Sequence, residues 1–165
     1  MTGQSDKLLS AHAREEIEHW LAKYPPDQRQ SAVLAALRAV QHENHGYLST
    51  ELMDAVADYL GMAKIAVYEV ASFYSMFETR PVGRHSVSIC TNISCMLNGA
   101  DDLVSHIENR LGIKTGESTP DGRIYLKQEE ECLAACCGGP MLMVDHIYHE
   151  HLSKEKVDQI LDQLD

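Results

Sequence analysis

The chain has 165 residues, of which 14 are basic and 25 acidic, and its formal net charge is -11. A surface this acidic repels phosphate backbones, which argues against nucleic-acid binding. The segment Met1–Leu9 lacks the apolar core that an export signal requires, and no apolar run in the chain is long enough to span a bilayer. The sequence therefore predicts a soluble, cytoplasmic protein whose partners are proteins or small redox carriers.

Helical periodicity dominates the sequence from about Ala11 to Glu78. A first apolar stripe is interrupted by Pro25 and Pro26, and a second stripe follows directly. A third helix is expected between an N-cap at Ser49 and a closing glycine at Gly61. This part of the chain is predicted to be a bundle of helices.

The fourth predicted helix runs from Ile65 to Phe77 and is apolar on more than one stripe. We expect it to be the most buried helix of the set, since a helix that is apolar nearly all round packs inside a protein. Its aromatic residues are expected in the core rather than on a partner surface. They are Tyr68, Phe73, Tyr74 and Phe77.

After Pro81 the pattern changes to strands and helices. The expected elements are the strand His85–Cys90, the helix Asn98–Leu111, the strand Arg123–Lys127, a hairpin of Met141–Val144 with Ile147–Leu152, and a last helix capped by Ser153. This order is typical of a small α/β domain. The chain is therefore divided into a helical domain, residues 1–80, and an α/β domain, residues 81–165.

Four of the five cysteines form two tight pairs, Cys90 with Cys95 and Cys132 with Cys136. Four thiolates in two pairs suit either a tetrahedral zinc ion or a 2Fe-2S cluster. Structural zinc favours Cys-x2-Cys spacing, whereas these pairs have gaps of four and three residues. The spacing favours iron and sulfide, and a zinc-stapled adaptor remains the alternative of a different class.

Both cysteine pairs follow predicted strands. If those strands run parallel, the two cysteine loops lie at the same end of one sheet. Pro140 is a candidate for a cis peptide bond that shapes the second loop. Backbone N–H groups of residues 91–94, and those of Gly138 and Gly139, are expected to donate to the cluster sulfurs.

The fifth cysteine and a group of three histidines are weaker candidates for metal ligands. Cys137 makes the cysteine count odd, which argues against a disulfide framework, and it is expected to be a small buried thiol. His146, His149 and His151 lie close together, but alternate residues of a strand point to opposite faces. A second metal site at these histidines is therefore disfavoured.

Several segments together resemble one family. They are FYSMF at 73–77, PVGRH at 81–85, CTNISC at 90–95, NGA at 98–100 and ECLAACCGGP at 131–140. The chain resembles the 24 kDa subunit family of NADH:quinone oxidoreductase (respiratory complex I), also called the E subunits, and with it the thioredoxin-like 2Fe-2S ferredoxins. The resemblance implies an α+β fold in which an N-terminal helical bundle precedes a thioredoxin-like α/β domain. It also implies that Cys90, Cys95, Cys132 and Cys136 bind one 2Fe-2S cluster.

In function, the resemblance implies an electron-transfer subunit of a proton-translocating enzyme. The chain is expected to dock on a flavoprotein subunit that holds FMN and the NADH site, beside other subunits of the peripheral arm on the cytoplasmic face of the inner membrane. The chain itself is expected to have no substrate site, since no Gly-x-Gly-x-x-Gly turn opens a helix. Equivalent subunits of NAD-reducing hydrogenases and NAD-dependent formate dehydrogenases remain the close alternative.

Overall fold

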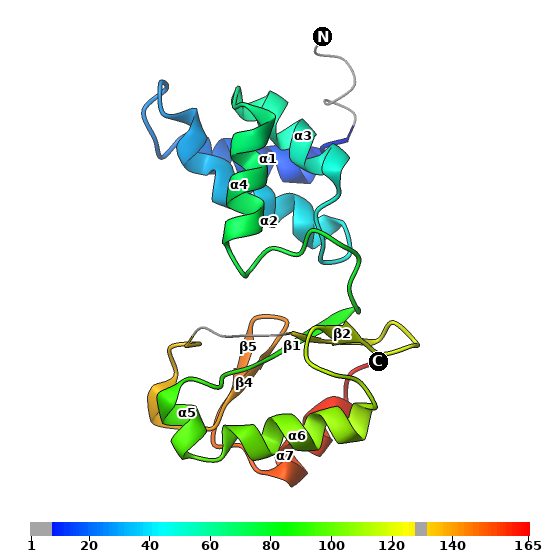
Figure 1. Cartoon of the computed structure of the whole chain (residues 1–165). Helices are drawn as coiled ribbons and strands as arrows, with labels where there is room; N and C mark the ends of the chain where they lie inside the picture. The colour runs from blue at the N-terminus through cyan, green and yellow to red at the C-terminus, as the bar shows by residue number, and fades with distance from the viewer. Residues whose placement is uncertain (1–7, 128–131) are drawn as a thin grey trace. The chain divides into compact units, whose positions relative to one another are not determined.

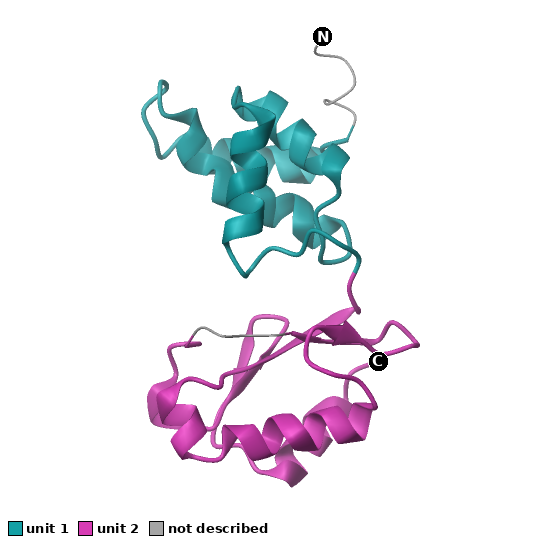
Figure 2. Ribbon diagram, viewed as in Figure 1, with its two compact units in different colours: residues 1–81 teal, residues 82–165 magenta. Residues whose placement is uncertain are grey.

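A computed structural model describes residues 8–127 and 132–165 of the chain. It divides into two compact units, residues 1–81 and residues 82–165, which Figure 2 shows in different colours. Each unit has its own buried apolar core. We describe the two units one at a time.

The first unit is helical in the part that the structure describes (Figure 1). Its elements are α1 (Ala11–Leu21), the 3₁₀ helix η2 (Arg29–Ala32), α2 (Val33–Glu43), α3 (Thr50–Leu60) and α4 (Lys64–Phe73). The predicted ends of α3 are confirmed: the Ser49 hydroxyl accepts a hydrogen bond from the Leu52 amide at 3.3 Å, and Gly61 ends the helix with a φ of 72°. The helices pack around fully buried side chains such as Ile17, Leu37 and Val56.

The predictions for α4 were wrong in two respects. The helix ends at Phe73 rather than Phe77, and it buries only Val67 and Ala71. Phe73 is 79% exposed and Tyr74 is 39% exposed, whereas Phe77 is buried at 6% as predicted. The backbone becomes extended at Tyr74 (ψ 123°). The apolar residues after this point are therefore no longer on the helical face that packs against the core.

The second unit consists of a sheet with helices. Its elements are β1 (His85–Ile89), α5 (Ile93–Leu97), α6 (Ala100–Leu111), β2 (Glu117–Ser118), β3 (Ile124–Lys127), the 3₁₀ helix η3 (Cys136–Gly138), β4 (Leu142–Val144), β5 (Ile147–His149) and α7 (Lys154–Asp162). The strand order is β2-β3-β1-β4-β5. The predicted order of helices first and sheet second is confirmed, and the fold class is α+β.

The parallel pairing of β1 with β3, on which the site prediction depended, is confirmed: Val87 pairs with Leu126. The other neighbours in the sheet are antiparallel. The predicted hairpin of β4 and β5 is also present, and its two turn residues, Asp145 and His146, both have positive φ. That conformation is typical of a two-residue hairpin turn.

Helices α6 and α7 lie side by side along the sheet, as Figure 1 shows. Arg110 of α6 joins Asp162 of α7 at 2.6 Å, and His106 bonds Asp158 at 2.8 Å. The apolar core of the unit combines residues of both helices with the inner face of the strands. Its fully buried members include Ile89, Ile107, Ile124, Leu126, Leu142 and Leu161.

The short elements α5, with five residues, and β2, with two, were not predicted, and neither were the 3₁₀ helices η2 and η3. The second hairpin strand is shorter than expected, since β5 ends at His149 rather than Leu152. In the part of the chain that the structure describes, every helix is too short or too polar to cross a bilayer.

Candidate metal centre

The first cysteine pair lies directly after β1. Cys90 follows the last strand residue and Cys95 lies within α5, whose first turn is capped by the Asn92 side chain accepting from the Ile93 amide at 2.8 Å. Both thiols are buried, with 2% and 1% of their surface exposed. The Cys90 amide donates to the Met141 carbonyl at 3.2 Å, which fixes this end of β1 against the chain entering β4.

The second pair lies in the loop between β3 and β4. Cys132 and Cys136 are both exposed, and their sulfur atoms lie 3.3 Å apart. The Ala134 amide points at the Cys132 sulfur at 3.4 Å, and Ala134 has a φ of 63°. A backbone turned in this way presents two thiols of one short loop to the same point.

The two loops contact each other. The Ser94 hydroxyl donates to the Cys136 carbonyl at 3.0 Å. A small apolar cluster, separate from the main core, joins Cys90, Cys95, Ala100 and Met141, with Leu133 and Ala135 packed against it. The parallel pairing of β1 with β3 therefore brings the four predicted ligand residues from both loops to one end of the second unit.

Gly139 lies close to the first cysteine loop. A Cβ atom at this position would lie 3.3 Å from the Cys95 sulfur and 3.7 Å from the Cys136 carbonyl oxygen. Any side chain here crowds the thiol of the other pair. The Gly139–Pro140 peptide bond is cis, as predicted.

The pKa values of the thiols reflect their shared surroundings. Burial, and then the neighbouring Cys90 thiol, raise the pKa of Cys95 to about 11. The Ala134 amide, and then the Cys136 thiol, hold the pKa of Cys132 below its usual range. The hydrogen bond to Cys132 and its charge raise the pKa of Cys136. Thiols of the two pairs thus influence one another, since Cys132 acts on Cys95 and Cys90 acts on Cys136.

Two sequence predictions about this site were wrong. Cys137 is exposed, not buried, because η3 turns it away from the small cluster that holds Cys90 and Cys95. Two of the amides expected to donate to the cluster donate within the chain instead: Ile93 to the Asn92 side chain and Gly138 to the Ala135 carbonyl at 2.9 Å. The acidic run 129–131 lies outside the described residues.

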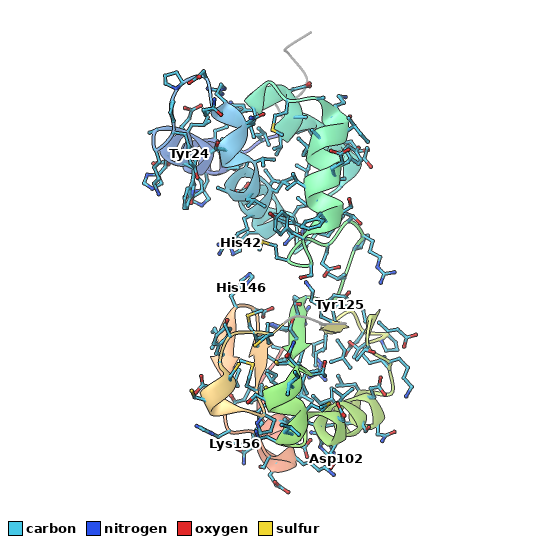
Figure 3. All side chains as sticks on the ribbon, turned by 60° about the vertical axis from the view of Figure 1, so that its left-hand side comes forward. Tyr24, His42, Asp102, Tyr125, His146 and Lys156 are labelled. Atoms are coloured by element: carbon cyan, nitrogen blue, oxygen red, sulfur yellow. The ribbon has the colours of Figure 1, made fainter. Side chains whose placement is uncertain are left out.

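The sequence disfavours a second metal site at the histidines near β5. His146 lies in the hairpin turn, on the opposite side of the unit from Lys156 of α7 and Asp102 of α6 (Figure 3). Across residues 8–127 and 132–165, no three His, Cys, Asp or Glu side chains are grouped as ligands of a single metal ion.

The donor set fits a 2Fe-2S cluster by its chemistry, since each iron takes two thiolates and the loops supply one pair each. The buried pair supplies a dry side and the exposed pair an open side. Sequence reasoning missed the contacts that join the loops, namely the Ser94 hydroxyl and the small cluster around Met141. Only the small and apolar residue types near each cysteine pair hinted at such packing.

Comparison with known proteins supports this interpretation. The family model of the thioredoxin-like [2Fe-2S] ferredoxins matches residues 17–165. The NADH-quinone oxidoreductase E subunit numbered 2 of Rhizobium meliloti is 44% identical over 90% of the chain and 86% of its own length. The NADH-quinone oxidoreductase E subunit of Rickettsia felis is 39% identical over 88% of the chain and 87% of its own length.

Longer proteins also match. The mitochondrial NADH dehydrogenase [ubiquinone] flavoprotein 2 of Dictyostelium discoideum is 40% identical over 90% of the chain and 60% of its own length. Among solved structures, the air-oxidized NAD+-reducing [NiFe]-hydrogenase matches with a TM-score of 0.68 at 20% identity, over 82% of this chain and 24% of the hydrogenase chain. That likeness shows the fold. The chain belongs to the thioredoxin-like [2Fe-2S] ferredoxin family and, within it, to the group of E subunits of NADH-quinone oxidoreductase, an oxidoreductase complex.

Proposed function

We propose that the chain is the electron-transfer subunit of NADH-quinone oxidoreductase, holding a 2Fe-2S cluster that exchanges electrons with FMN on a flavoprotein subunit. The observation that carries this proposal is the convergence of two thiol pairs, from loops far apart in sequence, at one end of the sheet. The assignment to this complex is supported by the relatives named as E subunits, which are 38–44% identical over most of the chain.

In this proposal Cys90, Cys95, Cys132 and Cys136 are the four cluster ligands. A bound 2Fe-2S cluster supplies a one-electron redox centre. The protein's part is to fix four thiolates and to limit water: Cys90 and Cys95 are shielded by the small apolar cluster, and Ser94 ties the two loops at a set distance. Such outer contacts set ligand orientation and tune a metal site.

The two units have different roles in the proposal. Residues 81–165 form the cluster domain, since all five cysteines lie there, and residues 1–80 form a helical domain that assists docking on the flavoprotein. The complete chain lies in the peripheral arm, on the cytoplasmic face of the inner membrane. NADH and FMN are bound by the partner subunit.

A second candidate is the equivalent subunit of an NAD-reducing hydrogenase. The hydrogenase chains match in fold at 20% identity, and this chain spans about a quarter of their length. The relatives from NADH-quinone oxidoreductase are far more similar in sequence, which favours the respiratory complex. Co-purification of the native complex decides between them, because quinone reductase activity or hydrogenase activity then accompanies the chain.

The test of the centre itself uses the purified full-length chain. We expect two irons, two sulfides, a red-brown colour, and one unpaired spin in electron paramagnetic resonance after anaerobic reduction. Cys132→Ser and Cys136→Ser, made singly, are expected to lose or alter that signal, whereas the matched control Cys137→Ser keeps it. A colourless protein with stoichiometric zinc would overturn the proposal and support a structural staple.

A further inference from the structure

The segment that follows β5 is fixed along the second cysteine loop by backbone hydrogen bonds. The His151 amide donates to the Gly138 carbonyl at 2.7 Å, and the Leu152 amide donates to the Pro140 carbonyl at 3.0 Å. His151 has a φ of 50°, a left-handed conformation that is uncommon for residues other than glycine. The backbone therefore holds the preceding residue, Glu150, beside this loop.

The Glu150 side chain fills the space that Gly138 leaves open. A Cβ atom on Gly138 would lie 2.5 Å from the Glu150 carboxyl carbon, 2.5 Å from its Oε2 and 2.7 Å from its Cβ. Gly138 is the last residue of η3, and the predicted ligand Cys136 is the first. Because position 138 has no side chain, a carboxylate can lie against the ligand loop, two residues in sequence from one of the four thiols.

A carboxylate at this place opposes the reduction of a cluster that the loops hold. Reduction transfers one electron from the reductant to the cluster, and no bond forms or breaks. The cluster gains one negative charge, which a nearby carboxylate repels, and net charge is one of the quantities that set the potential of such centres. The Glu150 side chain is exposed, so water and salt screen part of this repulsion.

We propose that Glu150 lowers the reduction potential of the 2Fe-2S cluster through the charge of its carboxylate. Gly138 contributes to this effect, because it leaves room for the carboxylate beside the loop. The proposal rests on the proposed function and deepens it. It adds a residue outside the four ligands that sets the potential at which the cluster accepts its electron.

The test is a potentiometric titration of the full-length chain with its cluster, in which dithionite is the reductant and the spin signal reports the reduced centre. Glu150→Gln keeps the size of the side chain and removes its charge. A unit charge about 10 Å away in a water-like medium changes an equilibrium about twofold, so we expect this variant to favour reduction at least about twofold, or about 18 mV for one electron. Glu150→Lys reverses the charge and is expected to raise the potential about twice as far.

Two controls separate the charge of Glu150 from its packing and its place. Glu150→Asp keeps the charge, and its potential is expected to lie closer to that of the unaltered chain than the potential of Glu150→Gln does. Asp162→Asn removes a negative charge from the far end of α7, where Asp162 joins Arg110 at 2.6 Å. Arg110 lies about 15 Å along α6 from Ala100, a member of the small apolar cluster, so we expect less than half the shift of Glu150→Gln.

Salt provides a readout that a purely structural role would not move. The Debye length falls from about 30 Å at about 10 mM salt to about 3 Å at about 1 M, so the difference in potential between Glu150→Gln and the unaltered chain is expected to shrink by at least half. Equal potentials at low salt, opposite shifts in Glu150→Gln and Glu150→Lys, or a difference that salt leaves unchanged would overturn the proposal. A chain without a spin signal refutes the cluster itself, whereas a normal signal with an unshifted potential refutes only the role of Glu150.

Discussion

Gly83 offers the sharpest test of how the sheet positions the cysteine loops. It precedes β1, and its amide donates to the Ser118 hydroxyl at 3.0 Å. A Cβ atom here would lie 2.5 Å from the Ile124 carbonyl carbon, 2.6 Å from the Tyr125 nitrogen and 2.8 Å from the Ile124 oxygen. All three are backbone atoms of β3, so no side chain can swing aside.

The overlap sets the expected magnitude for Gly83→Ala. The three contacts fall about 0.6 to 0.9 Å short of the 3.4 Å at which ordinary contact begins. Overpacking costs about 1–3 kcal/mol, and a rigid backbone neighbour places this site near the upper end, at about 3 kcal/mol. For a unit of this size the midpoint temperature falls by roughly 15 °C.

The matched control is Gly112→Ala, in the same unit. Gly112 ends α6 with a φ of 68° and has open space around the position of a Cβ, so alanine there meets only left-handed backbone strain of about 1 kcal/mol. Hydrogen exchange read by mass spectrometry on β1 and β3 measures the local free energy of opening. The single tryptophan, Trp20, lies in the helical unit, and its fluorescence checks that this unit is unchanged. If Gly83→Ala and Gly112→Ala lowered the free energy of opening of β1 and β3 by equal amounts, the close-packing argument would be refuted.

Three further substitutions test particular contacts. The Asp145 carboxylate bonds His85 at 2.6 Å and raises the pKa of that histidine, and Asp145→Asn removes this carboxylate. The pair of charges therefore stabilises the folded state fully below the ordinary histidine pKa, and this stability is lost as the pH rises through the raised pKa. Because Asp145 is solvent-accessible, we expect a urea-unfolding deficit of at most about 1 kcal/mol at pH 6 that vanishes by pH 9, and a deficit independent of pH would contradict the pairing. Ser153→Ala removes the hydroxyl that caps α7 and is expected to cost about 1 kcal/mol, whereas an unchanged urea midpoint would show that the cap is dispensable. Gly139→Ala, at a φ of -67° that alanine readily adopts, is expected to change the spin-resonance spectrum by displacing the Cys95 sulfur, and an identical spectrum would place that contact outside the centre.

The sequence was most informative where one residue type has one structural role. Ser49 and Ser153 cap helices as predicted, and Gly61 and Gly112 end them in left-handed conformation. The parallel pairing of β1 and β3 followed from the helix that separates them in sequence. These are local rules that need no knowledge of distant contacts.

Sequence reasoning failed where burial depends on packing partners. The helix predicted from Ile65 to Phe77 was expected to be the most buried of the set, yet α4 ends at Phe73 and leaves that ring 79% exposed. An apolar residue at helical spacing is buried only if another element packs against it, and a single sequence does not show which element that is. Helix α5 was missed because five residues are too few to show a period.

The same limit applied at the site. The types and spacing of the cysteines predicted which of them belong together, and the structure places both pairs at one end of the sheet. The exposure of Cys137 was not predictable, because it depends on the turn of η3 relative to the small cluster. The Ser94 contact joins residues 42 positions apart and carries no local signal.

The order of the chain has a consequence for biogenesis. The two thiol pairs meet only after β3 has paired with β1, and the Met141 carbonyl that receives the Cys90 amide belongs to the residue just before β4. During synthesis the ribosome must therefore deliver the chain at least through Met141 before the ligand loops can close on each other. In the proposed function, the four ligands are together only in the folded unit, so mutations that slow sheet formation are expected to leave iron-free protein even when every thiol is intact.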